Sequence, residues 1–149
     1  MPVHHAYIVA AARTAGGRRG GKLAAWHPAD LAGVVLDALV ARAGIDPAAV
    51  EDVILGCVGQ AGEQSGNIAR SAVMASNLPD HVPAVSIDRQ CGSSQQALHF
   101  AAQAVMSGTQ DVVIAAGVES KTRVPMGTAT ILAMQAGVGV GPWSKRILD

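Results

Sequence analysis

The sequence has little charge imbalance, little cysteine and no long hydrophobic run, and each shortage excludes a class of protein. Lys and Arg together number 11, as do Asp and Glu, so no global field recruits nucleic acid or an anionic membrane. The two cysteines form no CxxC pair, which argues against a disulfide framework, a metal site and the usual redox motif. No apolar run approaches the roughly 20 residues that span a bilayer, and the N-terminus lacks the basic region of a secretory signal. We therefore expect a soluble, cytoplasmic protein with reduced thiols.

Small and aliphatic residues make up for the scarcity of aromatic ones. Half of the 149 residues are hydrophobic but only 3% are aromatic, and 17 are glycine. An interior built mainly from Ala, Val, Leu and Ile allows backbones to approach closely. A chain of this length fits one domain and can bury a core. The composition favours an enzyme that acts on small molecules.

Short apolar runs alternate with segments of helical spacing along the first 120 residues. The runs that we expect to form buried strands are 6–12, 53–58, 84–88 and 111–116. The helices expected between them are 28–43, 67–76 and 95–107. Beyond Gly117 the sequence is rich in Gly, Pro, Thr and Met and has no clear period. This order predicts an α/β fold in which helices cover a largely parallel, layered sheet.

Cys91 follows the third expected strand and precedes the third expected helix. In parallel α/β sheets, reactive groups collect beyond the carboxyl ends of the strands. A helix N-terminus favours the thiolate, which is the nucleophilic form of cysteine. Gly92 permits a close approach to the backbone, and amides of the turn can hydrogen-bond a developing oxyanion. Position alone leaves Cys91 as compatible with an inert core residue as with a nucleophile.

The residues around Cys91 favour the nucleophile. The stretch SIDRQCGSSQQA, at 86–97, resembles the nucleophile motif of thiolases, and GVES, at 117–120, resembles the second N-terminal signature of that family. The segment GCVGQAGEQSGNIAR, at 56–70, resembles the family segment ahead of the nucleophile. The resemblance covers about residues 7–127. Two motifs in the right order make a chance match improbable.

The resemblance implies a thiolase-like fold. Residues 1–120 would supply the N-terminal core half, and residues 121–149 the truncated start of a loop domain that binds coenzyme A. It also implies an acyl-CoA acyltransferase in which Cys91 takes an acyl group from a 3-ketoacyl-CoA, or acetyl from acetyl-CoA, and passes it to a second thiol or carbanion. Coenzyme A thioesters of fatty acid metabolism are then substrates, no cofactor or metal is implied, and a homodimer or homotetramer is expected.

The family places its other catalytic residues in the C-terminal half. They are a His in a GHP motif, an Asn in an NEAF motif and a second Cys in a CxG motif, and neither GHP nor NEAF occurs in this sequence. We therefore expect the isolated chain to be inactive and a complementing C-terminal half to be required. Two alternatives stay open: a condensing enzyme of the ketoacyl synthase type, and a non-catalytic scaffold that retains the fold. Acyl length and reaction direction do not follow from the sequence.

Other reactive or charged residues are better explained by structure than by chemistry. Cys57 lies within the second expected strand, where a buried small residue is the stronger interpretation. His99 lies in the middle of a helix, where a hydrogen-bonded core histidine is favoured over a catalytic base. Residues 16–22 carry the glycines and Lys of a phosphate loop, but Leu23 replaces the required Ser or Thr, which favours a flexible basic loop. Lys121 stands where thiolases commonly carry Met.

Overall fold

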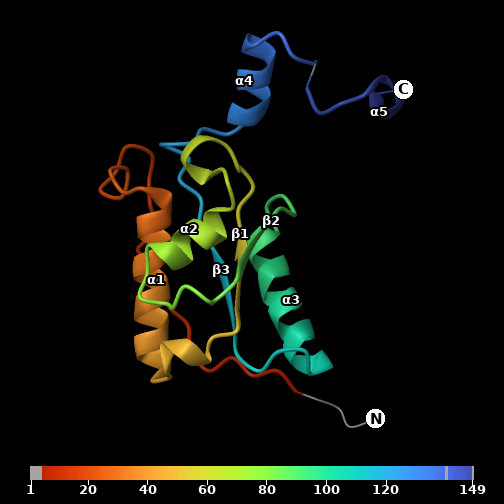
Figure 1. The fold of residues 1–149 in the computed structure, drawn as a ribbon. Coiled ribbons are helices and arrows are strands. Elements are labelled where there is room, and N and C mark those ends of the chain that lie inside the picture. Colours follow the sequence, from red (N-terminus) through yellow and green to blue (C-terminus); the bar gives the residue numbers. More distant parts are fainter. Residues whose placement is uncertain (1–4, 140, 149) are drawn as a thin grey trace.

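A small parallel sheet forms the centre of the molecule in the computed structural model, which describes residues 5–139 and 141–148 (Figure 1). The three strands are β1 (Asp52–Gly56), β2 (Ala84–Ile87) and β3 (Val113–Gly117), in the order β2-β1-β3. Both pairings are parallel, and Val53 of the central strand lies opposite Ala84 and Ile114. The predicted α/β class and parallel pairing are confirmed for these three runs.

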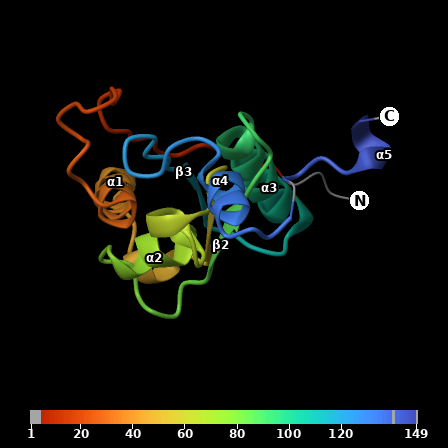
Figure 2. The same cartoon turned by 90° about the horizontal axis from the view of Figure 1, so that it is seen from above.

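Helices cover both faces of this sheet (Figures 1 and 2). Helices α1 (Pro28–Ala43) and α2 (Ile68–Met74) lie on one face, where the larger core cluster includes Leu36, Leu55 and Ile68. Helix α3 (Ser93–Ser107) lies on the other face, over a smaller cluster of Ile54, Ala97 and Ala101. Leu55 and Ile54 pack into opposite layers because successive side chains point to opposite faces of a strand.

The helix boundaries follow from local capping. The Nδ1 atom of His27 accepts a hydrogen bond from the Ala29 amide at 3.2 Å, and Pro28 occupies the first turn of α1, where it is tolerated. Gly44 and Gly108 end α1 and α3 in the left-handed conformation, with φ of 66° and 73°. The remaining elements are short: η1 (Pro47–Ala49), η2 (Gly62–Gln64), α4 (Thr128–Gln135) and α5 (Lys145–Leu148).

The predicted first strand, residues 6–12, is wrong for this chain. The segment is assigned no strand, and Tyr7, Ile8 and Val9 are 79%, 74% and 79% exposed. A buried strand needs a hydrogen-bonded neighbour and a layer over each face. Within the described ranges, the backbone of residues 6–12 makes no hydrogen bond to other backbone groups. Its one hydrogen bond is to a side chain, because the Arg42 guanidinium donates to the Ala11 carbonyl.

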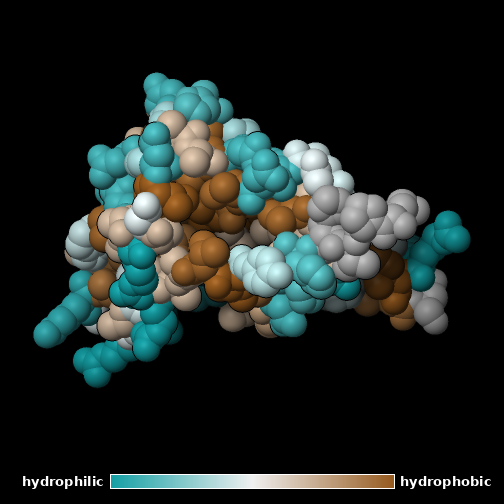
Figure 3. Space-filling view, turned by 90° about the horizontal axis from the view of Figure 1, so that it is seen from below, coloured by the Kyte–Doolittle hydropathy of each residue, from teal (hydrophilic) through white to brown (hydrophobic). Residues whose placement is uncertain are grey.

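Apolar side chains are also exposed elsewhere. On α3, Leu98, Phe100 and Met106 are 43%, 42% and 49% exposed. Apolar atoms gather over much of the face that Figure 3 shows from below. In the part of the chain that the structure describes, no helix has the length and apolar character needed to cross a membrane.

Candidate active site

Cys91 lies in the turn between β2 and α3, beyond the carboxyl end of the strand, and it is exposed. The preceding residue, Gln90, has a φ of 49°, which is uncommon for a residue with a side chain and often marks a functional turn. Asp88 stabilises this conformation, because its Oδ1 accepts a hydrogen bond from the Gln90 amide at 2.7 Å. The Gly92 amide then donates to the Arg89 carbonyl at 3.1 Å and closes the turn around Cys91.

Ser93 fixes this turn to the first turn of α3. Its buried side-chain oxygen accepts from the Arg89 amide at 2.9 Å and donates to the Gln90 carbonyl at 2.6 Å. The Arg89 guanidinium donates to Oε1 of Gln96 one turn further along the helix, at 2.6 Å. Hydrogen bonds on both sides of Cys91 therefore hold its backbone in one conformation.

The N-terminus of α3 has backbone amides without a backbone partner near this turn. Gly92 is the N-cap, and no side chain caps the helix. Among the backbone hydrogen bonds of the described chain, none uses the amides of Ser94 or Gln95 as donors. Free amides at a helix start attract negative charge, so they suit either a thiolate or the oxyanion of an acyl transfer.

Two glycines let α3 begin close to the strand ends. A Cβ atom at Gly56 would lie 2.4 Å from the backbone carbon of Ser93 and from the Ser94 nitrogen. A Cβ at Gly117 would lie 1.9 Å from Oγ of Ser94. Separations below 3.0 Å do not occur for real Cβ atoms, so both strands must end in glycine for the helix to take this position. The position of Cys91 thus depends on residues from three separate motifs.

The loops after β1 and β3 are bound together beside the site. Gln64 is fully buried, its Nε2 donates to the Gly59 carbonyl at 2.7 Å, and its Oε1 accepts from the Ser120 amide at 2.7 Å. Oε1 of Glu119 accepts from the Gly59 amide at 2.7 Å and pairs with Nζ of Lys121 at 2.7 Å. These contacts give Glu119 a structural role in joining the two loops. The sequence did not predict a role for Gln64. The only signal for it was its position in the segment at 56–70 that resembles thiolases.

Cys57 has surroundings opposite to those of Cys91. It lies just after β1 and is buried, and its amide donates to the Ile87 carbonyl at 3.0 Å. Burial, and after it the negative charge of Glu119, raise the pKa of the Cys57 thiol to about 11. The prediction of a buried, structural Cys57 is confirmed, although the residue follows the strand rather than lying within it.

The other residues singled out from the sequence give mixed outcomes. His99 is exposed on α3, so its interpretation as a core histidine is wrong. Residues 16–18 are irregular and residues 19–26 form turns and bends, and the Gly20 amide donates to Oγ1 of Thr122 at 3.1 Å. Helix α1 begins only at Pro28, too far along to be opened by a phosphate loop, which supports the interpretation as a basic loop.

Comparison with known proteins identifies the family. The model of the thiolase N-terminal domain matches residues 6–143. A steroid 3-ketoacyl-CoA thiolase of Mycobacterium tuberculosis is 52% identical over 132 residues, which cover 89% of this chain and 32% of that protein. A beta-ketoadipyl-CoA thiolase of Acinetobacter baylyi is 45% identical over 122 residues, which cover 81% of this chain and 30% of that protein.

A solved structure agrees with these relatives. The acetyl-CoA acetyltransferase of Bacillus anthracis matches with a TM-score of 0.78 at 40% identity, over 83% of this chain and 31% of that one. The chain therefore spans about a third of the length of the relatives it matches. The match covers the strands, the Cys91 turn and the loop after β3. The chain belongs to the thiolase family and corresponds to its N-terminal domain.

Proposed function

We propose that this chain carries the nucleophile of a thiolase-type acyl-CoA acyltransferase, and that Cys91 is that nucleophile. The observation that carries the proposal is the exposed thiol on a braced turn at the start of α3, inside the SIDRQCGSSQQA motif. The other cysteine is buried and its raised pKa keeps it protonated at neutral pH. Of the two thiols, Cys91 alone combines access with backbone donors.

The proposed reaction proceeds in two steps. The Cys91 thiolate attacks the 3-keto carbonyl of a 3-ketoacyl-CoA, the bond between C2 and C3 breaks, and the departing carbanion takes a proton to give acetyl-CoA. The acyl group is now on sulfur, and the thiol of coenzyme A attacks it, releases the shortened acyl-CoA and restores the thiolate. Run backwards, the same steps condense acetyl-CoA. Free amides at the start of α3 are candidate oxyanion donors, and no metal or further cofactor enters this scheme.

This chain does not supply every group that the scheme needs. Proton transfer at the α-carbon requires a base within reach of it, and none of the residues assigned to the site has that role. We propose that a C-terminal thiolase half provides the base and further oxyanion donors. The chain would then form part of a cytoplasmic homodimer or homotetramer that binds acyl-CoA and coenzyme A.

Residues 121–149 fit the proposed start of a loop domain, beyond a core of residues 1–120. Helix α4 stands away from the sheet layers (Figure 1), and Ile131, Leu132 and Met134 on it are 49%, 54% and 58% exposed. Met126, just before α4, is 78% exposed. Apolar side chains exposed to this extent indicate that α4 packs against a partner outside this chain.

The thiolysis of acetoacetyl-CoA tests the function. The tagged chain would be purified alone and after co-expression with the remaining part of the M. tuberculosis relative. We expect multiple turnovers from the complex only, a loss of at least about a thousandfold in Cys91→Ala, and activity within a few fold of the unchanged complex in Cys57→Ala. Cys91-dependent turnover by the chain alone would refute the need for a second half. A stable complex in which Cys91 is never acylated would favour the scaffold.

A further inference from the structure

The chain leaves its core through one short turn after β3, residues 120–124, which we call the exit turn. The Val124 amide donates to the Ser120 carbonyl at 2.8 Å, and the Val124 side chain is only 2% exposed. Beyond it, none of residues 125–139 and 141–148 is buried, and α4 stands away from the sheet layers (Figure 1). Helix α4 therefore takes its direction from the exit turn, because it has no buried contact of its own.

Two neighbouring residues of η2 hold the exit turn. The buried Gln64 accepts a hydrogen bond from the Ser120 amide at 2.7 Å. Next to it, the two carboxylate oxygens of Glu63 accept from Nε and Nη2 of Arg123, the second of these at 2.6 Å. A guanidinium held through two parallel hydrogen bonds is fixed in direction as well as in distance, which a single ammonium is not.

Arg123 also reaches the loop that precedes α1. Its Nη1 atom lies 3.4 Å from the carbonyl oxygens of both Ala24 and Ala25. The Gly20 amide of the same loop donates to Oγ1 of Thr122 at 3.1 Å. Three segments that are far apart in the sequence, namely this loop, η2 and the exit turn, therefore meet at one guanidinium.

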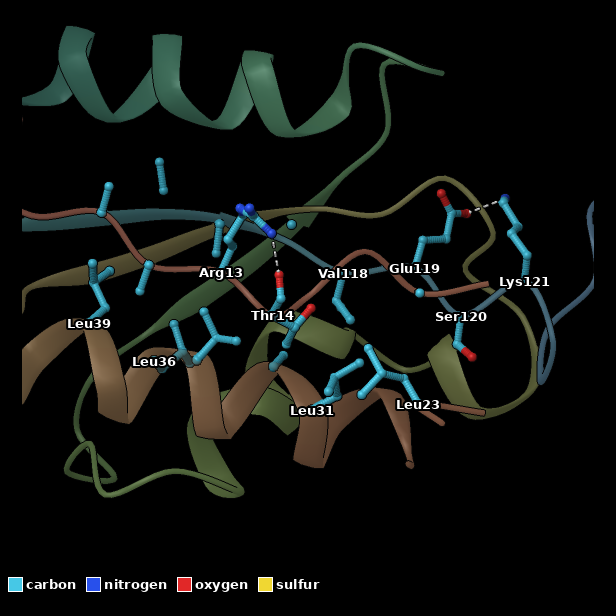
Figure 4. Close-up of a pocket in the computed structure, with 18 of the residues that line it drawn as sticks. Arg13, Thr14, Leu23, Leu31, Leu36, Leu39, Val118, Glu119, Ser120 and Lys121 are labelled. Carbon is cyan, nitrogen blue, oxygen red and sulfur yellow. Dashed lines mark hydrogen bonds and ion pairs between the residues drawn. The ribbon is translucent and has the colours of Figure 1, made fainter. Parts of the chain in front are cut away.

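The exit turn begins where the strands end. Figure 4 shows Ser120 and Lys121 towards one end of a cavity of about 610 Å³ beside β3, and Leu23 of the loop before α1 lies towards the same end. The parallel strands have their carboxyl ends here, and the turn that carries Cys91 follows one of them. The direction of the exit turn thus sets where the following segment lies relative to the thiol.

We propose that Arg123 and Glu63 are positioning residues, whose ion pair fixes the direction of the exit turn and so aligns the coenzyme-binding part of the enzyme with Cys91. This inference rests on the proposed function in taking residues 121–149 as the start of that part. The nucleophile does not need the pair, because Ser93 braces its turn separately. Loss of the pair therefore weakens the binding of coenzyme A and leaves the chemistry at sulfur unchanged.

The pair acts through geometry more than through stability. The side chains of Arg123 and Glu63 are 30% and 36% exposed, and ion pairs at such positions contribute little to the free energy of unfolding. The hydrogen bond from Arg123 lowers the pKa of the Glu63 carboxyl below its ordinary value, so the pair is intact at neutral pH. The pair of Lys121 with Glu119 joins residues two positions apart, so it does not tie the exit turn to η2.

Thiolysis kinetics of the completed enzyme test the proposal. The tagged chain is co-expressed with the remaining part of the M. tuberculosis relative, and acylation of Cys91 is measured separately at saturating acetoacetyl-CoA. We expect Glu63→Gln, which removes the charge and keeps the size, to raise KM for coenzyme A at least about fivefold, with kcat and acylation within about twofold. Arg123→Lys, which keeps the charge but not the fork, changes KM in the same direction. If Glu63→Gln does not fold by circular dichroism, Arg123→Lys decides.

Asp80→Asn is the matched control, because it also removes one negative charge. Asp80 is exposed, and within the described ranges its backbone carbonyl, but not its carboxylate, is hydrogen-bonded. We expect its KM for coenzyme A to equal that of the unchanged enzyme. A KM that neither Glu63→Gln nor Arg123→Lys alters, or one that Asp80→Asn raises equally, overturns the proposal. A fall in kcat at constant KM also overturns it, since the pair would then act on the nucleophile.

A distance measurement on the chain itself examines the geometry without any activity. Spin labels at Val34→Cys on α1 and Met134→Cys on α4 report the distance from the core to α4 in a chain that carries Cys91→Ala. Both labelled positions are exposed, and the remaining cysteine is buried. We expect Glu63→Gln to broaden the distance distribution at least about twofold and Asp80→Asn to leave it unchanged. An unchanged distribution in Glu63→Gln overturns the proposal.

The two measurements separate this inference from the proposed function. A completed enzyme that shows no thiolysis refutes the function, and the spin-label distance alone then decides whether the pair positions α4. Thiolysis with a KM that Glu63→Gln and Arg123→Lys leave unchanged refutes the positioning role and keeps the function.

Discussion

The two cysteines lie at the same end of the sheet but in different surroundings. Cys91 is exposed beside the free amides that open α3, whereas Cys57 is buried and the pKa of its thiol is raised to about 11. At neutral pH a thiol with that pKa is ionised in only about one molecule in ten thousand. We expect iodoacetamide to label Cys91 at least about tenfold faster than Cys57 in the folded chain, as measured by peptide mass mapping. Faster labelling of Cys57 would show that the site is assigned to the wrong residue.

Because the Cys57 thiol is buried, the free energy of unfolding depends on pH in the alkaline range. The Cys57 thiol has a pKa of about 11 in the folded protein against an ordinary value of 9.0, so the folded state holds its proton more tightly. This contribution to the free energy of unfolding is fully present below pH 9.0 and is lost as the pH rises through about 11. We expect urea unfolding to show a smaller alkaline loss of stability in Cys57→Ala than in the unchanged chain. Equal slopes in the two proteins would contradict the burial of the thiol.

At the scale of elements, the packing of α3 on the strand ends determines where Cys91 lies. Gly56→Ala would place a methyl group 2.4 Å from the backbone of Ser93 and Ser94, and overpacking of this kind costs about 1–3 kcal/mol. We expect that loss in urea unfolding together with slower alkylation of Cys91. Gly16→Ala is the matched control, because nothing lies within 4 Å of the added Cβ. Unchanged stability and labelling in Gly56→Ala would refute the close approach.

The two loops beside the site depend on Gln64. Its side chain holds the Gly59 carbonyl and the Ser120 amide, each at 2.7 Å, and it is fully buried. Gln64→Ala leaves both backbone groups without that partner, for an expected loss of about 1–3 kcal/mol in the free energy of unfolding. The exposed Gln103→Ala on α3 should change it by less than about 0.5 kcal/mol. Similar denaturation midpoints for the two variants would exclude a bracing role.

At the scale of elements, the sequence predicted the strands and helix ends that depend on neighbouring residues in the chain. The runs 53–58, 84–88 and 111–116 each overlap a strand, and the helices predicted to end at residues 43 and 107 do end there, before Gly44 and Gly108. Apolar runs and helix-ending glycines depend only on residues that are close in the sequence. Residues 6–12 have an equally apolar pattern, but whether they pair depends on a neighbour that the pattern does not contain. The exposure of His99 has the same cause, since helix spacing does not say which faces are covered.

The candidate site was predictable to a similar extent. Motif resemblance located Cys91, and strand order placed it at the carboxyl edge of the sheet. The contacts that brace it join residues far apart in the sequence, such as Gln64 with Ser120 and Gly56 with Ser94. No spacing rule relates such residues, so these contacts emerged only from the structure.

At the scale of the whole molecule, one of the exposed apolar regions lies on the β2 side of the sheet. Leu98 of α3 lines the cavity beside β3, and a residue two positions further along a helix is rotated by about 200°, so Phe100 lies on the opposite side of the helix. Phe100 is 42% exposed, and Val85 on β2, the other edge strand, is 44% exposed. This β2 side adjoins the turn that carries Cys91.

We expect this β2 side to form the subunit contact of the proposed homo-oligomer, because apolar side chains exposed on an edge strand and its covering helix favour association with a second copy. The complex of the chain with its completing part should have at least the mass of a dimer by light scattering at micromolar concentration. Phe100→Glu should shift it towards half that mass, since a dimer contact would bury the added charge without a partner. Met106→Glu is the control: Met106 is 49% exposed and, by the same rotation, lies on the face of α3 that points away from the sheet. A complex that is monomeric before substitution, or one that Phe100→Glu leaves unchanged, would place the subunit contact elsewhere.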